Sequence, residues 1–267
     1  MYFYYFEGKH RAGVTRNKLN EFNFKLQLSG DITKNSKRPY ILHRVNAKLS
    51  SIFKFYRKFR LQVFGEYSSN VVGFDKELAG MNNATTVRGY FQTFEYIDSV
   101  REDLIGDFDV RHASKIFRNL SKVIKKNRPI VIHIRGGDYK SNQQTIGMLD
   151  QDYYSAALKQ ANKFDANSKY WVFSNDKDYA TQLIYRLRIK PDQSIFPEDG
   201  LSDAETMKLM SLGSGIIICN STFSWWAAYL NSNPRFVICP DKWFRGLDDP
   251  LALCPPNWIR VKSSWVS

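Results

Sequence analysis

Short apolar runs alternate with helix-like spacings along the second half of the chain, from about residue 130 onward. The apolar runs typical of buried strands are 130–134, 170–174, 194–196, 215–219 and 235–239. Segments with the spacing of helices lie between them at 150–164, 176–187, 202–212 and 221–230. This alternation predicts an α/β fold, in which a parallel sheet is covered by helices on both faces.

Capping signals support the predicted helices. An Asp stands near the start of 150–164, and acidic residues occupy the first turn of 176–187, where the helix dipole favours them. Ser202 is followed three residues later by Glu205, which is the spacing of a capping box.

The first 130 residues are less regular. Apolar and basic residues mix in 52–64, where the alternation favours strands and a basic amphipathic helix stays open as the alternative. Apolar residues between 96 and 117 have helical spacing. We therefore place a boundary near residue 128, with one domain at 1–128 and a regular domain at 129–267.

Composition and charge narrow the functional classes. The chain has 43% hydrophobic and 24% charged residues, which is typical of a globular protein and excludes a disordered one. Its 39 basic and 26 acidic residues give a net charge of +13, which suggests an anionic partner: nucleic acid, a membrane surface or a phosphorylated small molecule. Residues 1–70 hold 14 basic and 4 acidic groups, so the excess lies there.

Some classes of site and location are disfavoured. Three cysteines are too few for a disulfide scaffold, and Cys219 and Cys239 end apolar runs, so we expect buried, inert thiols. Paired Cys/His spacing, P-loop and dinucleotide-binding sequences do not occur. No apolar run approaches the ~18 residues of a membrane span, so we expect a cytoplasmic protein.

The segment HIRGGDY (133–139) begins in the first predicted strand and turns after it. Two glycines allow the backbone to approach a ligand closely, and Arg135 can bind a phosphate in bidentate fashion. His133 lies on the same strand face as Arg135, so both can reach one crevice. The residues alone support a phosphate site and a polar turn with a structural Arg–Asp pair equally.

Two further polar segments follow predicted strands. NSTFSWW (220–226) opens a helix with free amides and the hydroxyls of Ser221 and Thr222, which suits an anion, although local physics favours plain N-capping. SND (174–176) can bind the edge of a base or cap the next helix. Because all three segments end parallel strands, we expect them along one crevice that fits a phosphorylated nucleotide.

These segments together resemble the α-1,2-fucosyltransferases of glycosyltransferase family 11. HIRGGDY resembles that family's HxRRGDY sequence, and LMSL with NSTFSWW (209–212, 220–226) and FSND (173–176) resemble its other hallmarks. Further matching segments are GYFQTFEYIDSVREDL (89–104), FVICPDKWF (236–244) and, more weakly, RNKLNEFNF (16–24).

The resemblance implies a GT-B-like fold, with a truncated N-terminal α/β domain on the acceptor side and a C-terminal Rossmann-like domain that binds the donor nucleotide. It implies inverting transfer of L-fucose from GDP-fucose to the 2-hydroxyl of a terminal galactoside, without a metal or other cofactor. The acceptor would be a bacterial surface glycan, O-antigen or capsule, assembled on a lipid at the inner face of the membrane.

Roles follow by position from the resemblance. Arg135 would neutralise the donor pyrophosphate, His133 would approach the ribose or guanine, and Asp138 would be the base or would orient Arg135. The remaining donor-binding candidates are Gly136, Ser174, Asn175, Asp176, Asn220, Ser221 and Thr222. Ser221 and Thr222 would hold the β-phosphate, and Asn175 or Asp176 would meet the guanine edge.

The chain departs from the family pattern in two places. Gly136 stands where the family has a second Arg, and we find no opening strand with a GGLGNQ-type loop, so Met1 would lie inside the family's N-terminal domain. These departures leave open a catalytically inactive relative that binds a nucleotide sugar or a glycan.

A nucleic-acid binder built on the basic residues of 52–64 is a further alternative. The near-neutral regular half, which carries the ordered motifs, disfavours it. Anionic lipid suits this basic segment better, and Lys54, Arg57, Lys58 and Arg60 would make the contact.

Overall fold

A computed structural model describes residues 9–10, 13–14, 21–22, 65–81 and 86–267. The basic segment 52–64 lies outside the described residues. The chain divides into two compact units, one of residues 1–17, 26–99 and 249–255 and the other of 18–25, 100–248 and 256–267.

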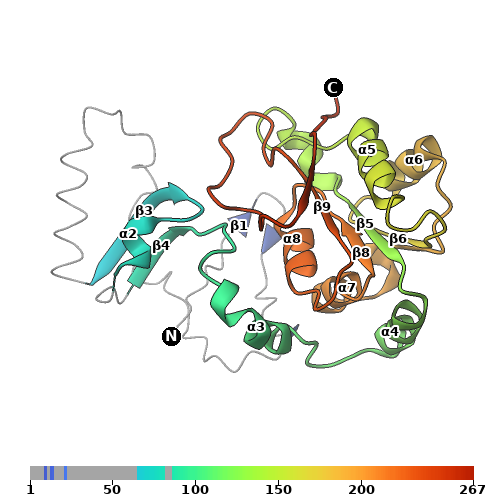
Figure 1. The fold of residues 1–267 in the computed structure, drawn as a ribbon, viewed down its shortest axis with the longest axis horizontal. Coiled ribbons are helices and arrows are strands. Elements are labelled where there is room, and N and C mark those ends of the chain that lie inside the picture. Colours follow the sequence, from blue (N-terminus) through green and yellow to red (C-terminus); the bar gives the residue numbers. More distant parts are fainter. Residues whose placement is uncertain (1–8, 11–12, 15–20, 23–64, 82–85) are drawn as a thin grey trace. The chain divides into compact units, whose positions relative to one another are not determined.

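The second unit is built on a parallel sheet of six strands (Figure 1). In chain order, the strands are β5 (Ile130–Ile134), β6 (Tyr170–Ser174), β7 (Gln193–Ile195), β8 (Gly215–Ile217), β9 (Val237–Pro240) and β10 (Ile259–Val261). Every pairing between them is parallel, so the predicted α/β class is confirmed. β10 was not predicted, because it has only three residues and lacks an apolar run.

The strand order is β10-β9-β8-β5-β6-β7. From β5 the chain first adds strands on one side and then returns to β8 on the other side. The order therefore reverses between β5 and β8, and open sheets of this kind bind ligands beside such a reversal, at the carboxyl ends of the strands.

Helices cover both faces of the sheet. They are α3 (Arg101–Asp107), α4 (Lys115–Asn127), α5 (Gln151–Ala161), α6 (Lys177–Leu187), α7 (Asp203–Met210) and α8 (Thr222–Tyr229). Short 3-10 turns are η5 (Asp98–Val100), η6 (Gly137–Asn142) and η7 (Pro197–Asp199). Figure 1 shows α5 and α6 on one side of the strands and α7 and α8 on the other.

The alternation of side chains along β5 creates two cores. Ile130, Ile132 and Ile134 share one apolar cluster with α5 and α6, in which Tyr153 and Tyr154 are fully enclosed. On the other face α4 packs against α7, and α7 packs against α8. Burial of both faces explains why these strands read as continuous apolar runs.

The helical spacing predicted across 96–117 is interrupted. α3 ends at Asp107, and a separate helix, α4, begins at Lys115 after the N-cap Ser114. α4 was not predicted as a separate helix, because frequent Lys and Arg residues break its apolar pattern. Both helices belong to the second compact unit, although they precede the domain boundary predicted at 128/129. The predicted division into an acceptor-side domain and a donor-binding domain stays a prediction.

Glu205 ties two helix N-termini together. The predicted capping box is confirmed, since Ser202 Oγ accepts from the Glu205 amide at 3.2 Å and Glu205 Oε2 accepts from the Ser202 amide at 3.0 Å. Glu205 Oε1 also accepts from the amide of Ser114, the N-cap of α4. This buried carboxylate therefore links α7 to α4 as well as capping its own helix.

The first unit is smaller in its described part. It contains β1 (Lys9–His10) paired antiparallel with β2 (Gly13–Val14), and β3 (Glu66–Val72) paired parallel with β4 (Thr86–Tyr90), with α2 (Lys76–Ala79) between them. Asp75 caps α2 and accepts hydrogen bonds from the hydroxyls of Tyr67 and Ser69.

Among the described residues of the chain, no helix is both long and apolar enough to cross a bilayer.

We predict that Glu205→Ala lowers the free energy of unfolding by about 2–3 kcal/mol, and that Ser202→Ala lowers it by about 1 kcal/mol. Glu205 satisfies two partly buried backbone donors, whereas Ser202 satisfies one. Urea denaturation measures both effects, with Glu198→Ala as the exposed-carboxylate control. Equal losses for the two variants would contradict the link between α4 and α7.

Candidate functional site

The three polar segments lie at one edge of the sheet. HIRGGDY continues from β5, SND ends β6, and NSTFSWW follows β8, and these three strands are direct neighbours. The register pairs Ile134 with Ser174 and Ile132 with Ile217, so the strands end at similar heights. The tertiary structure thus brings the predicted site segments together beside the reversal of strand order.

The loop after β5 is bound to the end of β6 through its backbone. The amide of Gly136 donates to Asn175 Oδ1 at 3.0 Å, and the amide of Gly137 donates to Asp176 Oδ2 at 2.8 Å. Lys140 Nζ also lies 2.6 Å from Asp176 Oδ2. These contacts fix the path of the HIRGGDY loop.

Gly136 has no room for a side chain in this arrangement. A Cβ atom there would lie 2.6 Å from Asp176 Oδ2 and 2.7 Å from Asp176 Cβ. The neighbouring Gly137 has φ +57°, where a Cβ atom would also meet the Asn175 amide group at 2.7 Å. The close approach to Asp176 therefore requires glycine at position 136 in this structure.

The side chains of SND are largely used within the protein. Asp176 caps α6 by accepting from the Tyr179 amide, so the capping interpretation is confirmed for this residue. Burial opposes ionisation of Asp176, but bonds from Lys140 and two amides outweigh it and hold its pKa below the ordinary value. Ser174 is buried and bonds to the backbone of Asp176.

Arg135 provides the positive charge of the site. Its guanidinium bonds to Asp138 at 2.8 Å and lies over the ring of Tyr139, 5.2 Å from the ring centroid. Within the described part of the chain, Arg135 Nε is buried and has no hydrogen-bond partner. The Arg135 side chain as a whole is 27% exposed, so part of the guanidinium is open to an anionic ligand.

Tyr139 connects the loop after β5 to the segment after β8. Its hydroxyl donates to the Asn220 carbonyl at 3.0 Å and shares a hydrogen bond with the Ser221 side chain. Burial raises the pKa of Tyr139 far above its ordinary range, so the phenol stays protonated. This crossing contact holds the two motifs at a fixed separation.

Beneath the loops, His133 and Cys219 form a buried pair. Cys219 Sγ lies 3.1 Å from His133 Nδ1, and the side chain of His133 is 3% exposed. Burial, with a smaller contribution from Arg135, lowers the pKa of His133 to about 3, and burial raises the pKa of Cys219 to about 12. Both groups are therefore neutral, and the thiol is buried as predicted.

The N-terminus of α8 faces the same edge of the sheet. Ser221 occupies the N-cap position, but its side chain makes no capping hydrogen bond, so the plain-capping interpretation is wrong for this residue. Thr222 is exposed at the first helical position. First-turn amides without a side-chain cap, at the positive end of a helix dipole, suit an anion.

Asn220 shapes the floor of the site. It is buried, and its amide group donates to the carbonyls of Ile146, Gly147 and Trp243 at 3.1–3.2 Å. One side chain thereby anchors the segment after β9 and the segment before α5. Nothing in the sequence connects these three distant positions, so the sequence analysis could not find this role.

The tryptophans after Ser221 pack as predicted. Trp225 stacks on Tyr229 with 4.8 Å between ring centroids, and Trp226 stacks on Phe108 with 4.9 Å between them.

Among the described residues, no group of three or more His, Cys, Asp or Glu side chains is placed to hold a metal ion.

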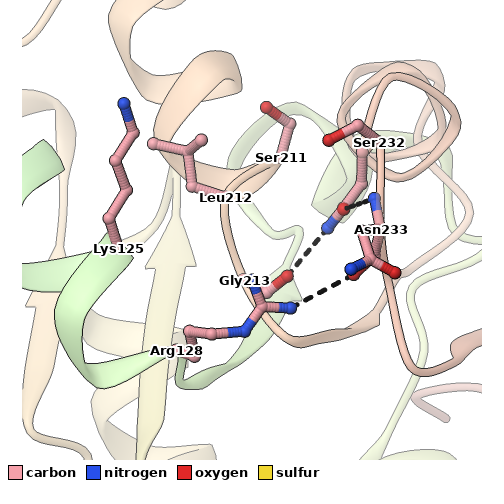
Figure 2. Close-up of a pocket in the computed structure, with 8 residues that line it drawn as sticks. Lys125, Arg128, Ser211, Leu212, Gly213, Ser232 and Asn233 are labelled. Carbon is pink, nitrogen blue, oxygen red and sulfur yellow. Dashed lines mark hydrogen bonds between the residues drawn. The ribbon is translucent and has the colours of Figure 1, made fainter.

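A small cavity lies at the opposite edge of the sheet (Figure 2). Its volume is about 140 Å³, and its lining includes Lys125, Arg128, Gly213 and Asn233. Arg128 and Gly213 each stand two residues before a strand, so the cavity is at the amino ends of β5 and β8. It is therefore separate from the candidate site, which lies at the carboxyl ends.

We predict that the free energy of unfolding falls by about 2 kcal/mol between pH 7 and pH 5 because of His133. The folded-state pKa of His133, about 3, is below its ordinary value of 6.5, so only the unfolded chain takes up a proton in this range. Stability from this source is complete above pH 6.5 and is lost as the pH falls toward 3. Urea titrations at both pH values measure it.

The matched comparison for this prediction is His133→Gln against His112→Gln, which removes an exposed histidine. The first variant should lose most of the pH dependence, and the second should keep it. An unchanged slope in His133→Gln would show that other groups cause the dependence.

We predict that Gly136→Ala lowers the free energy of unfolding by about 1–3 kcal/mol, because the new methyl group overlaps Asp176. Gly106→Ala in α3 is the control, since a Cβ atom there meets nothing within 4 Å and alanine favours a helix. The control should be neutral or stabilising. If both variants are equally stable, the close approach of Gly136 to Asp176 is not a constraint.

Comparison with known proteins adds a family assignment. The family model described as "Glycosyl transferase family 11" matches residues 39–260. An alpha-1,2-colitosyltransferase of Escherichia coli is 29% identical over 198 residues, which cover 71% of this chain and 67% of the relative. The O-antigen biosynthesis glycosyltransferase WbnK of Escherichia coli is 30% identical over 191 residues, covering 68% and 62%. The chain thus spans about two thirds of the length of these relatives.

Similarity to solved structures is partial. POFUT1 in complex with GDP is 13% identical, with a TM-score of 0.35 and coverage of 58% of this chain and 55% of that chain. ADP-heptose LPS heptosyltransferase II of E. coli is 12% identical, with a TM-score of 0.37 and coverage of 57% and 44%. At these TM-scores the α/β class rests on the observed sheet rather than on these similarities.

Proposed function

The chain belongs to glycosyl transferase family 11, and on that premise we propose that it transfers L-fucose from GDP-fucose to the 2-hydroxyl of a terminal galactoside. One observation carries the proposal. The HIRGGDY and NSTFSWW segments meet at the reversal of strand order, where Tyr139 joins them and the partly exposed Arg135 shares the edge of the sheet with the uncapped start of α8.

In this proposal the donor pyrophosphate lies between Arg135 and the first turn of α8. Arg135 supplies a full positive charge, and the α8 amides, with Ser221 and Thr222, supply hydrogen-bond donors and a dipole. The pair between Arg135 and Asp138 is partly exposed, at 27% and 58% of the two side chains, so a phosphate can share the guanidinium. These features support an anion at this position.

The guanosine part of the donor is proposed to lie beside the end of β6. Ser174 and Asp176 are held by the backbone contacts described above, which leaves the amide nitrogen of Asn175 as the more available group. That nitrogen is 3.5 Å from Asp138 Oδ1, a long contact that a base edge can replace. His133, neutral and enclosed beneath the loop, would support Arg135 rather than carry charge.

The reaction would be a single displacement with inversion at the anomeric carbon. A bond forms from the acceptor oxygen to that carbon, the bond from the carbon to the phosphate oxygen breaks, and GDP leaves with the electron pair. Arg135 stabilises the charge that develops on the leaving phosphate. We keep Asp138 as the proposed base for the acceptor proton; its pairing with Arg135 equally supports an orienting role. We expect the reaction to proceed without a resident metal or cofactor.

The similarity to the two Escherichia coli glycosyltransferases supports a proposal about where the protein works and on what acceptor. We propose a GT-B-like arrangement in a cytoplasmic protein that works at the inner face of the membrane on a lipid-linked surface glycan, such as an O-antigen or capsule precursor. The relative named as an alpha-1,2-colitosyltransferase makes a colitosyl donor the second candidate. A nucleotide-sugar or glycan-binding module without transfer is the alternative of a different class.

We predict that Arg135→Ala lowers kcat/KM for transfer from GDP-fucose roughly 100- to 1000-fold, which is the usual effect of removing one electrostatic donor from a developing charge. Arg186→Ala, an exposed arginine on α6, is the matched control and should keep full activity. Transfer to a panel of β-galactosides, from GDP-fucose and from a nucleotide-activated colitose, provides the measurement.

Calorimetric titration with GDP separates the outcomes. Binding with transfer supports the enzyme, and the donor that is used decides the sugar. Binding without transfer to any acceptor supports the binding module, and the absence of both refutes the proposed nucleotide site.

A further inference from the structure

The charge of residues 71–130 is strongly segregated. This stretch has 10 basic and 8 acidic residues, so it is nearly balanced as a whole. All eight acidic residues lie at or before Asp109, and seven of the ten basic residues lie at or after Arg111. The last third of the stretch, residues 111–130, therefore carries seven positive charges and no carboxylate.

The structure folds this run into α4 and its flanks. Lys115, Arg118, Lys122 and Lys125 follow one another at intervals of three, four and three residues, so they share one face of the helix. All four are exposed, and so are the remaining cations of the run, Arg111, Lys126 and Arg128. The opposite face of α4 is buried through Phe117, Ser121 and Ile124.

The cations of α4 are not neutralised from neighbouring elements. Over the described residues, no carboxylate forms an ion pair with any of the seven. The nearest acidic residue in the sequence, Asp109, pairs with Lys208 at 3.2 Å. Glu205, which contacts the start of α4, is buried and is occupied by two backbone amides. The field of this face is therefore open to an external anion.

Two exposed aliphatic side chains accompany the cationic face. Ile116 is 45% exposed and Val123 is 41% exposed. They are seven residues apart and thus lie on one stripe of the helix, beside the row of cations. Cations next to exposed aliphatic residues on a surface helix are typical of segments that lie in the headgroup region of a bilayer.

We propose that the exposed face of α4 binds the surface of an anionic lipid bilayer. Lys115, Arg118, Lys122 and Lys125 would meet the headgroup phosphates, and Ile116 and Val123 would enter the headgroup boundary. Single-stranded nucleic acid is the less suitable anion, because its binding surfaces carry aromatic side chains for base stacking and this face has none. The proposed surface uses none of the residues of the candidate site, and it does not depend on which sugar is transferred.

The test is co-sedimentation of the full chain with vesicles of phosphatidylglycerol and phosphatidylcholine in equal parts. The quadruple variant Lys115→Gln, Arg118→Gln, Lys122→Gln, Lys125→Gln should bind at least about tenfold more weakly than the original chain. The matched control is Lys159→Gln, Lys163→Gln, Arg186→Gln, Lys190→Gln, which removes the same charges from exposed positions of α5, α6 and their flanks and should bind almost normally. Thermal unfolding verifies that both variants fold.

A second variant separates lipid from a general anion. Ile116→Ser with Val123→Ser keeps every charge, and it should weaken vesicle binding while leaving binding to single-stranded DNA unchanged.

Equal losses in the two quadruple variants would overturn the proposal, because net charge alone would then act. Retained binding in the α4 variant, with loss only on neutralising Lys54, Arg57, Lys58 and Arg60, would overturn it in favour of that segment. Stronger binding to DNA than to vesicles would also overturn it. Transfer activity is measured separately, so its absence leaves this result interpretable.

Discussion

The backbone of Gly136 and Gly137 is held against the side chains of Asn175 and Asp176, and the rest of the candidate site depends on this contact. Two amide donors and a close approach that excludes Cβ atoms determine where the chain goes after β5. That path places Arg135 over Tyr139, and Tyr139 in turn reaches the segment after β8. A cation, a buried phenol and a helix N-terminus thus meet because two glycines permit a tight turn.

The electrostatics of the site follow from burial. His133, Cys219 and Tyr139 are titratable groups that desolvation keeps neutral at ordinary pH. The charge at this edge is therefore carried by Arg135, Asp138, Lys140 and Asp176, of which Asp176 and Lys140 neutralise each other. Arg135 is paired with Asp138, so an anion at this edge would have to share the guanidinium with that carboxylate. The exposed cations of α4 lie on a different element, where solvent screening limits the field of each one.

Local signals accounted for much of the fold. Ile130–Ile134 and Tyr170–Ser174 form strands at the predicted positions, because runs of apolar residues buried on both faces have few other conformations. The Ser202–Glu205 spacing predicted the start of α7, because the two side chains accept hydrogen bonds from backbone amides of the same helix turn. β10 and α4 were missed, since a three-residue edge strand and a lysine-rich helix depend on neighbours that the sequence does not reveal. HIRGGDY, SND and NSTFSWW were recognisable as site segments because each ends a predicted strand.

The sequence by itself determined the α/β class, the three segments of the candidate site and the resemblance to family 11, since each depends on residues close together in the chain. Only the tertiary structure decided how those residues are used. Asp176 is consumed by capping and by the Gly137 amide, Ser221 leaves its helix uncapped, and Asn220 binds three carbonyls from two distant loops. Hydrogen-bond partners far apart in sequence compete for the same polar atoms, and that competition is resolved only when the chain has folded.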